Sequence, residues 1–288
     1  MSHSVCDGFG AAQFFKAVTE LSRGESEVTV KPVWERERLL GKPNKELLQA
    51  LAAKAANSAV SPYLPTSNIS HEFFSINGES VKRLKETLGF STSGTSFTTI
   101  EALGAFVWRA RFRALELNPN GKTSLVLTTG IRKLLSPPLP EGYYGNAFVS
   151  TSAEFLGKEL DGEPLSKAAE EIKERKRDVF EGGFIAKHLD TFETLIDAGK
   201  NAKLPATGAV MVLTDWRNLE LMEEEMGFAW KVANITTLPW DMFGYVDLCL
   251  FLPPSKMDTS MKGGVKILVS LPKPAMAKFK EEIGALIC

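Results

Sequence analysis

The sequence predicts an α/β fold built around a mixed sheet. Its 288 residues are 44% hydrophobic and 24% charged, which is an ordinary globular composition with enough apolar residues for a sizeable core. Short apolar runs of strand length are interleaved with longer segments whose apolar residues recur at helical spacing. Because the two kinds of segment do not follow a strict strand–helix–strand rhythm, a mixed sheet is favoured over a doubly wound one.

The first quarter of the chain predicts one clear helix followed by a long connection. Residues 8–24 carry apolar side chains at helical spacing, Asp7 can cap the start, and Gly24 can end the helix. Residues 25–70 are rich in prolines and polar residues, which indicates a connection with one short helix near residues 44–57. Connections of this length are usually functional or link two domains.

Strands and helices alternate in the rest of the chain. Residues 71–88 predict a strand, a turn and a helix, residues 98–117 predict a long helix, and residues 163–200 are helical and heavily charged. The run "EEIKERKRD" is interpreted as a solvated helix face with charge pairs four residues apart. The remaining predictions are strands at "SLVLTTGI", "VSTSAEF", "AVMVLTDW", "LCLFLPP" and "VKILVSL", a turn-rich loop at "SPPLPEGYYGNAF" and a closing helix at "KPAMAKFKEEIGALI".

Charge and cysteine content exclude several classes of protein. A net charge of −1 provides no field to attract nucleic acid or an anionic membrane. No apolar run approaches the ~18 residues of a membrane span, and the N-terminus has neither the basic region nor the apolar stretch of a signal peptide. Cys6, Cys249 and Cys288 are widely spaced and odd in number, so neither a disulfide framework nor a metal site is expected. These features predict a reducing, cytoplasmic location.

The chain has three histidines, so any histidine chemistry must use His3, His71 or His188. His3 stands four residues before Asp7, in a turn that opens the first helix. A lone histidine near a terminus is usually a solvated residue or the remnant of a cloning tag. However, the partial positive charge of a helix N-terminus disfavours imidazolium, and a neutral imidazole is what a general base requires. His3 is therefore the candidate base.

The residues that follow His3 have structural interpretations. Asp7 either caps the helix or holds the turn in shape through a partner elsewhere, and neither role makes it a proton acceptor from a substrate. Gly8 would let the backbone approach a neighbour closely. Cys6 is interpreted as a packed apolar residue, since no basic cluster surrounds it to lower its pKa.

Five segments together resemble one family. "HSVCDGFGAAQF" resembles the His-x-x-x-Asp-Gly motif of the plant BAHD acyltransferases, which transfer acyl groups from coenzyme A thioesters to alcohols or amines. Four further segments resemble that family in the same order and extend the likeness over almost the whole chain: "TTIEALGAFVWRARFRAL", "IRKLLSPPLPEGYYGNAF", "VLTDWRNL" and "GGVKILVSLPKPAMAKF". His71 and His188 match none of these motifs and are interpreted as surface or loop residues.

The resemblance implies the fold of coenzyme A-dependent acyltransferases related to chloramphenicol acetyltransferase. That fold has two α/β domains with a solvent channel between them, and the motif histidine lies midway along the channel. On this basis residues 1–32 are expected to be a remnant of the first domain, 33–66 the crossover and 67–288 the second domain, with 225–250 packing back on the first. Family members carry a large stretch before the motif, so the chain is expected to be N-terminally shortened, as a truncated gene model or a short product.

The resemblance also implies a mechanism in which His3 takes the proton of the acceptor and later returns it to the coenzyme A thiolate. Acyl-CoA is then a co-substrate, the acceptor is an alcohol or amine of plant specialised metabolism, and a monomer without resident cofactor or metal is expected. One alternative stays open, a catalytically inactive family-like fragment that acts through partner binding or regulation. An unrelated α/β enzyme is a third possibility, which the collinear segments disfavour.

A second family motif, Asp-Phe-Gly-Trp-Gly, is altered in this chain. Its expected place holds Glu225-Met226-Gly227-Phe228-Ala229, of which only Gly227 is identical. In the family the motif is mainly structural and its aspartate pairs with an arginine near the "PPLP" loop, which implies a pairing of Glu225 with Arg132. The string "WDMFGYVD" at residues 240–247 is interpreted as a loop leading into the next strand.

Overall fold

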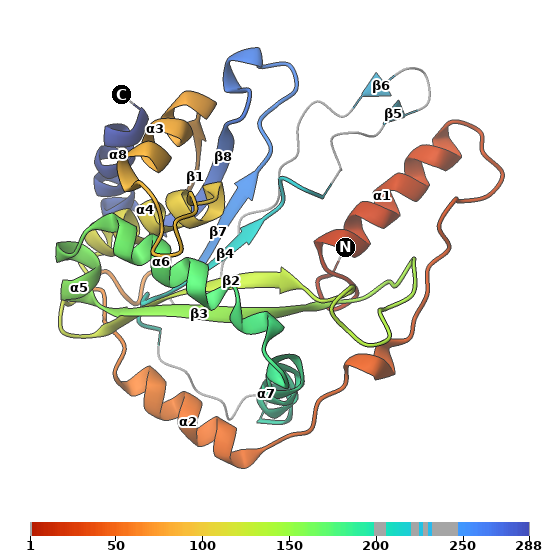
Figure 1. The fold of residues 1–288 in the computed structure, drawn as a ribbon, viewed down its shortest axis with the longest axis horizontal. Helices are drawn as coiled ribbons and strands as arrows, with labels where there is room; N and C mark the ends of the chain where they lie inside the picture. Colours follow the sequence, from red (N-terminus) through yellow and green to blue (C-terminus); the bar gives the residue numbers. More distant parts are fainter. Residues whose placement is uncertain (1, 199–205, 220–224, 227–229, 232–246, 288) are drawn as a thin grey trace.

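The protein has two layers, a six-stranded sheet and a set of helices packed on one of its faces (Figure 1). The computed structural model describes residues 2–198, 206–219, 225–226, 230–231 and 247–287. The strands of the sheet, in chain order, are β1 (Ile69–Ile76), β2 (Lys122–Gly130), β3 (Phe148–Leu156), β4 (Val210–Asp215), β7 (Asp247–Leu252) and β8 (Val265–Pro272), and a separate pair consists of β5 (Glu225–Met226) and β6 (Trp230–Lys231).

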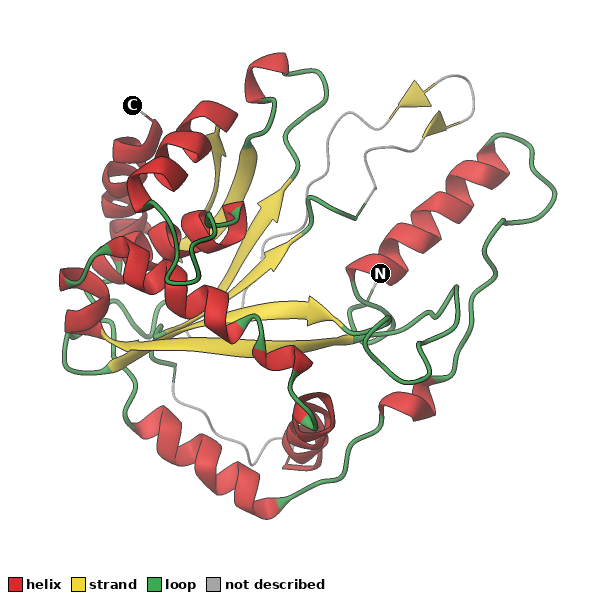
Figure 2. Cartoon of the chain, viewed as in Figure 1, coloured by secondary structure: helices red, strands yellow, loops and turns green. Residues whose placement is uncertain are grey.

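Eight α-helices accompany the strands in the described part of the chain (Figure 2). They are α1 (Gly8–Ser22), α2 (Lys45–Ala56), α3 (Gly78–Leu88), α4 (Thr99–Ala114), α5 (Gly157–Gly162), α6 (Leu165–Arg175), α7 (Phe184–Ala198) and α8 (Lys273–Ile287). Within the described residues, none of these helices combines the length and apolarity needed to cross a membrane.

The sheet is mixed, which confirms the fold class predicted from the sequence. Its order is β1-β8-β7-β4-β2-β3, and the three central neighbours β7, β4 and β2 run parallel. The flanking strands β8, β1 and β3 pair antiparallel with their neighbours. In the register, Leu125 of β2 lies opposite both Ala153 of β3 and Met211 of β4, so these apolar side chains point to the same face.

The main core lies between that face and helices α3, α4, α6 and α8. Trp108 and Leu103 of α4 are fully buried there, with Phe279 of α8 and Leu213 of β4. Among the described residues, strand side chains that point to the opposite face form a small cluster of Leu250, Leu252 and Leu268. The helices therefore stabilise the sheet mainly from one side.

The core also contains a buried ion pair. Arg111 of α4 donates to the carboxylate of Asp247 at the start of β7, and both side chains are almost fully buried. Burial lowers the pKa of the Arg111 guanidinium, and the carboxylate opposes that effect. Burial also raises the pKa of the neighbouring Cys249 thiol to about 12, so this cysteine is an inert core residue. Asp247 is the last residue of the string at 240–247, and residues 240–246 lie outside the described residues.

Several local predictions are refined by the structure. The charged segment 163–200 is divided into α6, a 3-10 turn at Asp178–Phe180 and α7, since glycines at 182 and 183 separate the two helices. The short helix α5 and the β5–β6 pair were not predicted from the sequence, because each is too short to show a periodicity. All six strands of the large sheet fall within residues 67–288, and the proposed domain division stays a prediction.

Candidate active site

The turn just before α1 lies beside the loop that enters β3 (Figure 1), and His3 belongs to this turn. Its imidazole is exposed and its ring stands edge-on to that of Phe148, with 6.2 Å between centroids. The backbone carbonyl of His3 accepts a hydrogen bond of 2.8 Å from Nδ2 of Asn146. The histidine is therefore anchored through its backbone, and no described residue forms a hydrogen bond with its ring nitrogens.

Asp7 is the main anchor of this turn. Its carboxylate accepts two N–H groups from Arg132, at 2.7 and 2.8 Å, and the backbone N–H groups of Ala147 and Gly10, both at 3.0 Å. Burial by itself would raise the pKa of Asp7, but these donors, Arg132 foremost, hold it below its ordinary value. A carboxylate with four donors stays ionised and serves as a brace, so it does not act as a proton acceptor.

Arg132 is committed to Asp7, a pairing that the sequence did not predict. It also donates to the carbonyl of Gly145 at 3.0 Å and lies over the rings of Phe9 and Tyr143. The expected partner Glu225 belongs to β5, which lies beside α1. The structure describes the backbone of Glu225 and not its side chain. Gly227 also lies outside them. A contact between Glu225 and Arg132 therefore stays a prediction.

Gly8 sits where the start of α1 meets the turn after β4. A Cβ atom at this position would lie 2.9 Å from Cδ1 of Leu219 and 3.8 Å from Nε1 of Trp216. A larger residue would force the end of the Leu219 side chain to shift, so glycine lets the helix start lie close to this turn. The His3 turn thus packs at the carboxyl ends of the parallel strands β2 and β4, the edge where ligands bind in open α/β sheets.

Residues of the connection 33–40 hold the same turn from the other side. Arg36 donates to the carbonyl of Val5 at 2.9 Å and lies over the ring of Trp34. The buried thiol of Cys6 donates to the hydroxyl of Tyr144 at 3.6 Å, and burial raises the pKa of that phenol to about 12. Cys6 is thus a packed residue and Tyr144 stays protonated, so neither competes with His3 as a base.

Of the other two histidines, His71 lies at the surface as interpreted, whereas His188 does not. His71 is exposed, but it lies on strand β1 and bonds to Ser270 through Nδ1 at 2.7 Å. His188 was interpreted as a surface or loop residue, which is wrong. It lies on α7, partly buried against β3, and its Nε2 accepts the backbone N–H of Ser150 at 3.1 Å. Burial lowers the pKa of His188 to about 4.

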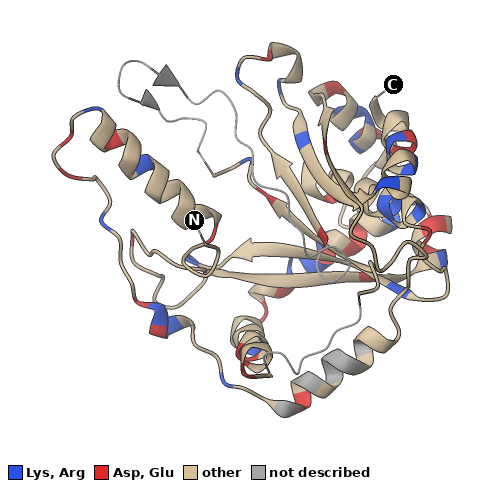
Figure 3. Cartoon of the chain, turned by 180° about the vertical axis from the view of Figure 1, so that it is seen from behind, with Lys and Arg blue, Asp and Glu red and all other residues tan. Residues whose placement is uncertain are grey.

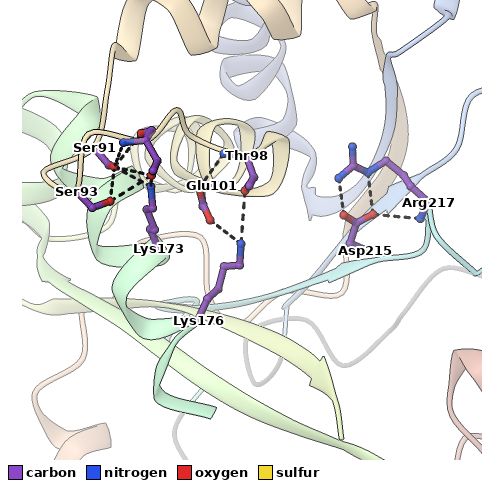
Figure 4. Close-up of polar contacts among 9 residues, drawn as sticks. Ser91, Ser93, Thr98, Glu101, Lys173, Lys176, Asp215 and Arg217 are labelled. Carbon is purple, nitrogen blue, oxygen red and sulfur yellow. Dashed lines mark hydrogen bonds and ion pairs between the residues drawn. The ribbon is translucent and has the colours of Figure 1, made fainter. Parts of the chain in front are cut away.

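A second polar cluster joins α6 to the loop between α3 and α4 (Figure 4). The buried Nζ of Lys173 donates to the hydroxyls of Ser91, at 2.7 Å, and Thr95, and Ser93 lies within hydrogen-bond distance of both hydroxyls. Lys176, one turn further along, donates to Glu101 at 2.6 Å. Cations surrounded by hydroxyls have the chemistry to bind a phosphate group.

The same close-up shows Asp215 and Arg217 at the end of β4 (Figure 4). Arg217 donates to the carboxylate of Asp215 through Nε at 2.8 Å and through Nη2 at 2.5 Å, so each satisfies the other's charge. Over the described ranges of the chain, no three His, Cys, Asp or Glu side chains gather as ligands for a metal ion.

Sequence reasoning missed Asn146 and Arg36, because both act through backbone atoms of the turn. The signal for Asn146 was present in "GYYGNAF", a segment already noted for its resemblance.

Comparison with known proteins tests that resemblance directly. The sequence model described as the Transferase family matches residues 1–286. The chain belongs to this family, the BAHD acyltransferases.

The curated BAHD relatives include two spermidine acyltransferases of Arabidopsis thaliana. The "Spermidine coumaroyl-CoA acyltransferase" is 39% identical over 293 residues, which cover 99% of this chain and 62% of the relative. The "Spermidine sinapoyl-CoA acyltransferase" is 38% identical over 290 residues, which cover 99% of this chain and 63% of the relative. A "Taxadien-5-alpha-ol O-acetyltransferase" of Taxus cuspidata is 29% identical, with 99% and 61% covered. The chain thus spans little more than three fifths of these relatives, 61–63%.

Solved structures show the same fold. TRI101 of F. sporotrichioides, complexed with coenzyme A and T-2, superposes with a TM-score of 0.68 at 18% identity, covering 96% of this chain and 62% of that one. Vinorine synthase superposes with a TM-score of 0.67 at 17% identity, covering 100% and 61%. The fold is therefore the acyltransferase fold related to chloramphenicol acetyltransferase that the sequence resemblance implied.

Proposed function

We propose that this chain carries the catalytic base of an acyl-CoA-dependent acyltransferase and that His3 is that base. The observation that supports this most is that Asp7 and His3 have different roles in the turn. Asp7 uses its carboxylate for four structural hydrogen bonds, whereas the exposed ring of His3 makes no hydrogen bond to any described residue and contacts the ring of Phe148. A rigid turn that presents one free imidazole is suited to general base catalysis.

The proposed reaction needs one proton carrier. The acceptor nitrogen or oxygen attacks the thioester carbonyl carbon, and His3 takes the proton that the acceptor loses. The tetrahedral intermediate then collapses, the carbon–sulfur bond breaks, and the coenzyme A sulfur leaves with the electron pair. The imidazolium of His3 returns the proton to that sulfur, which regenerates the neutral base and free coenzyme A.

The cluster around Lys173 is a candidate site for the anionic part of coenzyme A. Lys173 and Lys176 supply two ammonium groups on one side of α6, and Ser93 and Thr95 present exposed hydroxyls on the facing loop. A phosphate here would accept from Lys173 and from the hydroxyls of Ser93 and Thr95, and charge-assisted hydrogen bonds are roughly twice as strong as neutral ones. Replacing Ser93 and Thr95 by alanine should weaken coenzyme A binding without moving His3.

The names of the relatives support one class of acceptor over the other. Those with the highest identity here, at 38–39%, are named for spermidine, whereas relatives named for O-acylation stand near 29%. This difference favours an amine acceptor for the present chain, with an alcohol as the alternative. The buried thiol of Cys249 fits a reducing compartment, which supports the expected cytoplasmic location, and a monomer stays a prediction.

A non-catalytic binding role is the second candidate, because α1 exposes an apolar face. Phe14, Phe15 and Leu21 are each about half exposed, at 45–53%, and such a face is suited to contact with another protein surface. This role predicts no turnover under any condition.

The two candidates are separated by assaying release of free coenzyme A. The chain would be tested alone and fused behind the N-terminal segment of the Arabidopsis coumaroyl-CoA relative, with p-coumaroyl-CoA or acetyl-CoA as donor and spermidine or mixed alcohols as acceptor. We expect lower turnover for the chain alone, because the relatives are longer. In the fusion, His3→Ala should reduce turnover by at least ~10²-fold, whereas the control His71→Ala should not. Unchanged turnover in His3→Ala would refute the assignment.

A further inference from the structure

Three consecutive residues before β3 hold the turn that carries His3. The carbonyl of Gly145 accepts the backbone N–H of Asp7 at 3.5 Å, and the N–H of Ala147 donates to the Asp7 carboxylate at 3.0 Å. Between these two residues, Nδ2 of Asn146 donates to the carbonyl of His3 at 2.8 Å. The first and third residues therefore hold Asp7, and the middle one holds His3 itself.

The next residue of this segment lies against the ring of His3. Phe148 opens β3, and its ring stands edge-on to the imidazole, with 6.2 Å between centroids and 72° between planes. Phe148 is paired with Gly130 of β2, so its place is set by the sheet. Asn146 thus fixes the backbone from which the imidazole projects, while Phe148 limits the ring on one side.

The amide of Asn146 makes its hydrogen bond at a cost in stability. A carbonyl oxygen can only accept, so the amide must turn its nitrogen toward His3 and its oxygen away from that carbonyl. This oxygen, Oδ1, is buried, and no donor reaches it from the described residues. A buried acceptor without a donor loses its hydration without compensation. The bond made by Nδ2 contributes little, because His3 is exposed and its carbonyl would otherwise bond to water.

This balance separates Asn146 from the other groups that hold the turn. Asp7 accepts four hydrogen bonds, two of them from Arg132, so the two charges stabilise each other. Asn146 leaves one buried polar atom unpaired, and an apolar side chain of the same size would be at least as stable in its place. Such an arrangement is typical of a site where geometry matters more than stability.

We propose that Asn146 is a positioning residue for acyl transfer, which holds the backbone of His3 so that the imidazole meets the acceptor. The inference rests on the proposed function, because the place of the ring matters to the reaction only if His3 is the base. Asn146 itself touches neither the substrates nor the transferred proton. A displacement of about 1 Å can cost about 10²-fold in rate. Releasing the backbone of His3 should therefore lower kcat, while donor and acceptor still bind.

Two variants remove the amide. Asn146→Leu has nearly the same volume, and Asn146→Ala shows whether the larger side chain clashes. The matched control is Gln13→Leu, because Nε2 of Gln13 donates to the carbonyl of Gly142 at 3.2 Å. Gln13 thus joins α1 to the same loop through an amide, but away from His3. In thermal unfolding of the chain as numbered, both Asn146 variants should have a Tm equal to or above that of the wild type.

Turnover is measured in the fusion behind the N-terminal segment of the Arabidopsis coumaroyl-CoA relative, with His3→Ala in parallel. Both Asn146 variants should lower kcat by about 10- to 100-fold. Their KM values for p-coumaroyl-CoA and spermidine should change by less than about 2-fold, and Gln13→Leu should stay within about 2-fold in kcat and KM. In NMR spectra of the chain as numbered, the nuclear Overhauser contact between the rings of His3 and Phe148 should weaken in the Asn146 variants and persist in Gln13→Leu.

Four results would overturn the inference, for different reasons. A Tm lowered in both Asn146 variants would show a structural role. A raised KM with unchanged kcat would place Asn146 in a binding site. Unchanged kcat and KM, with His3→Ala inactive, would refute the positioning role alone and leave His3 as the base. Full turnover in His3→Ala, or a wild type without turnover both alone and in the fusion, would refute the proposed function and this inference with it.

Discussion

Helices α1 and α4 have nearly the same length, 15 and 16 residues, yet they are held in opposite ways. Helix α4 lies in the centre of the main core, with Leu103, Val107 and Trp108 fully buried. Helix α1 stands apart from the sheet and carries only two charged residues, Lys16 and Glu20 (Figure 3). Its apolar side chains Phe9, Phe14, Phe15, Val18 and Leu21 are 38–53% exposed.

Polar contacts join the first half of α1 to the loop between β2 and β3. Asp7 bonds to Arg132, and Nε2 of Gln13 donates to the carbonyl of Gly142 at 3.2 Å. The segment after α1 is joined to the same loop by a bridge between Val33 and Tyr143. Directional bonds set the position of the His3 turn, whereas apolar burial supplies most of the stability of the sheet. The candidate active site is therefore geometrically defined but belongs to the less stable part of the molecule.

The largest effect is expected in the core. Asp247→Ala leaves the buried Arg111 without its carboxylate and should lower the free energy of unfolding by about 3–5 kcal/mol, measured by urea denaturation. The matched control is Asp161→Ala, because Asp161 pairs with Arg113 on the exposed side of the same helix, and it should cost less than about 1 kcal/mol. Equal losses in the two variants would contradict the assignment of the core as the stable region.

A smaller loss is expected at the His3 turn. Asp7→Asn keeps an oxygen for the helix cap but removes the charge paired with Arg132, so it should cost about 2 kcal/mol. Since the folded pKa of Asp7 is lowered, its contribution is present above its unfolded pKa of about 3.8 and disappears as the pH falls below that value. Hydrogen exchange should show faster exchange in residues 3–10 and unchanged protection in β4. Slower or uniform exchange would show that Asp7 does not brace the turn.

Protonation of His188 should lower the stability at the edge of the sheet, where α7 packs on β3, and not at its centre. The folded pKa is about 4 and the unfolded pKa about 6.5, so stability is complete above pH 6.5 and declines between 6.5 and 4, as only the unfolded ring binds a proton. The decline should reach about 1–2 kcal/mol, since the ring is partly solvated. His188→Gln keeps an acceptor for Ser150 and should abolish this pH dependence. A persisting decline in that variant would assign it to other groups.

The smallest effect on stability is expected on the exposed face of α1. Phe15→Gln should change the free energy of unfolding by less than about 0.5 kcal/mol, while Leu103→Ala in α4 should cost about 2–5 kcal/mol. If the face of α1 causes self-association, Phe15→Gln should reduce it in sedimentation velocity at high concentration. A large loss of stability in Phe15→Gln would mean that this side chain is buried in solution.

The sequence by itself determined the longer regular elements and the family. Helical and strand periodicity are local properties, so α4, α8 and the six strands could be placed from the printed residues. Asp7 was recognisable as a helix cap for the same reason, since it contacts Gly10 three residues away. The mixed character of the sheet followed from the order of these elements.

Only the tertiary structure decided which residues meet. Arg132 reaches Asp7 across 125 residues of sequence, and Asn146 reaches the backbone of His3 across 143. No local pattern specifies such partners, because a side chain that bonds to a distant backbone carbonyl leaves no periodicity in the chain. His188 shows the same limit: its spacing from Phe184 and Phe192 was visible, but its burial against Ser150 came from the packing of α7 on the edge of the sheet.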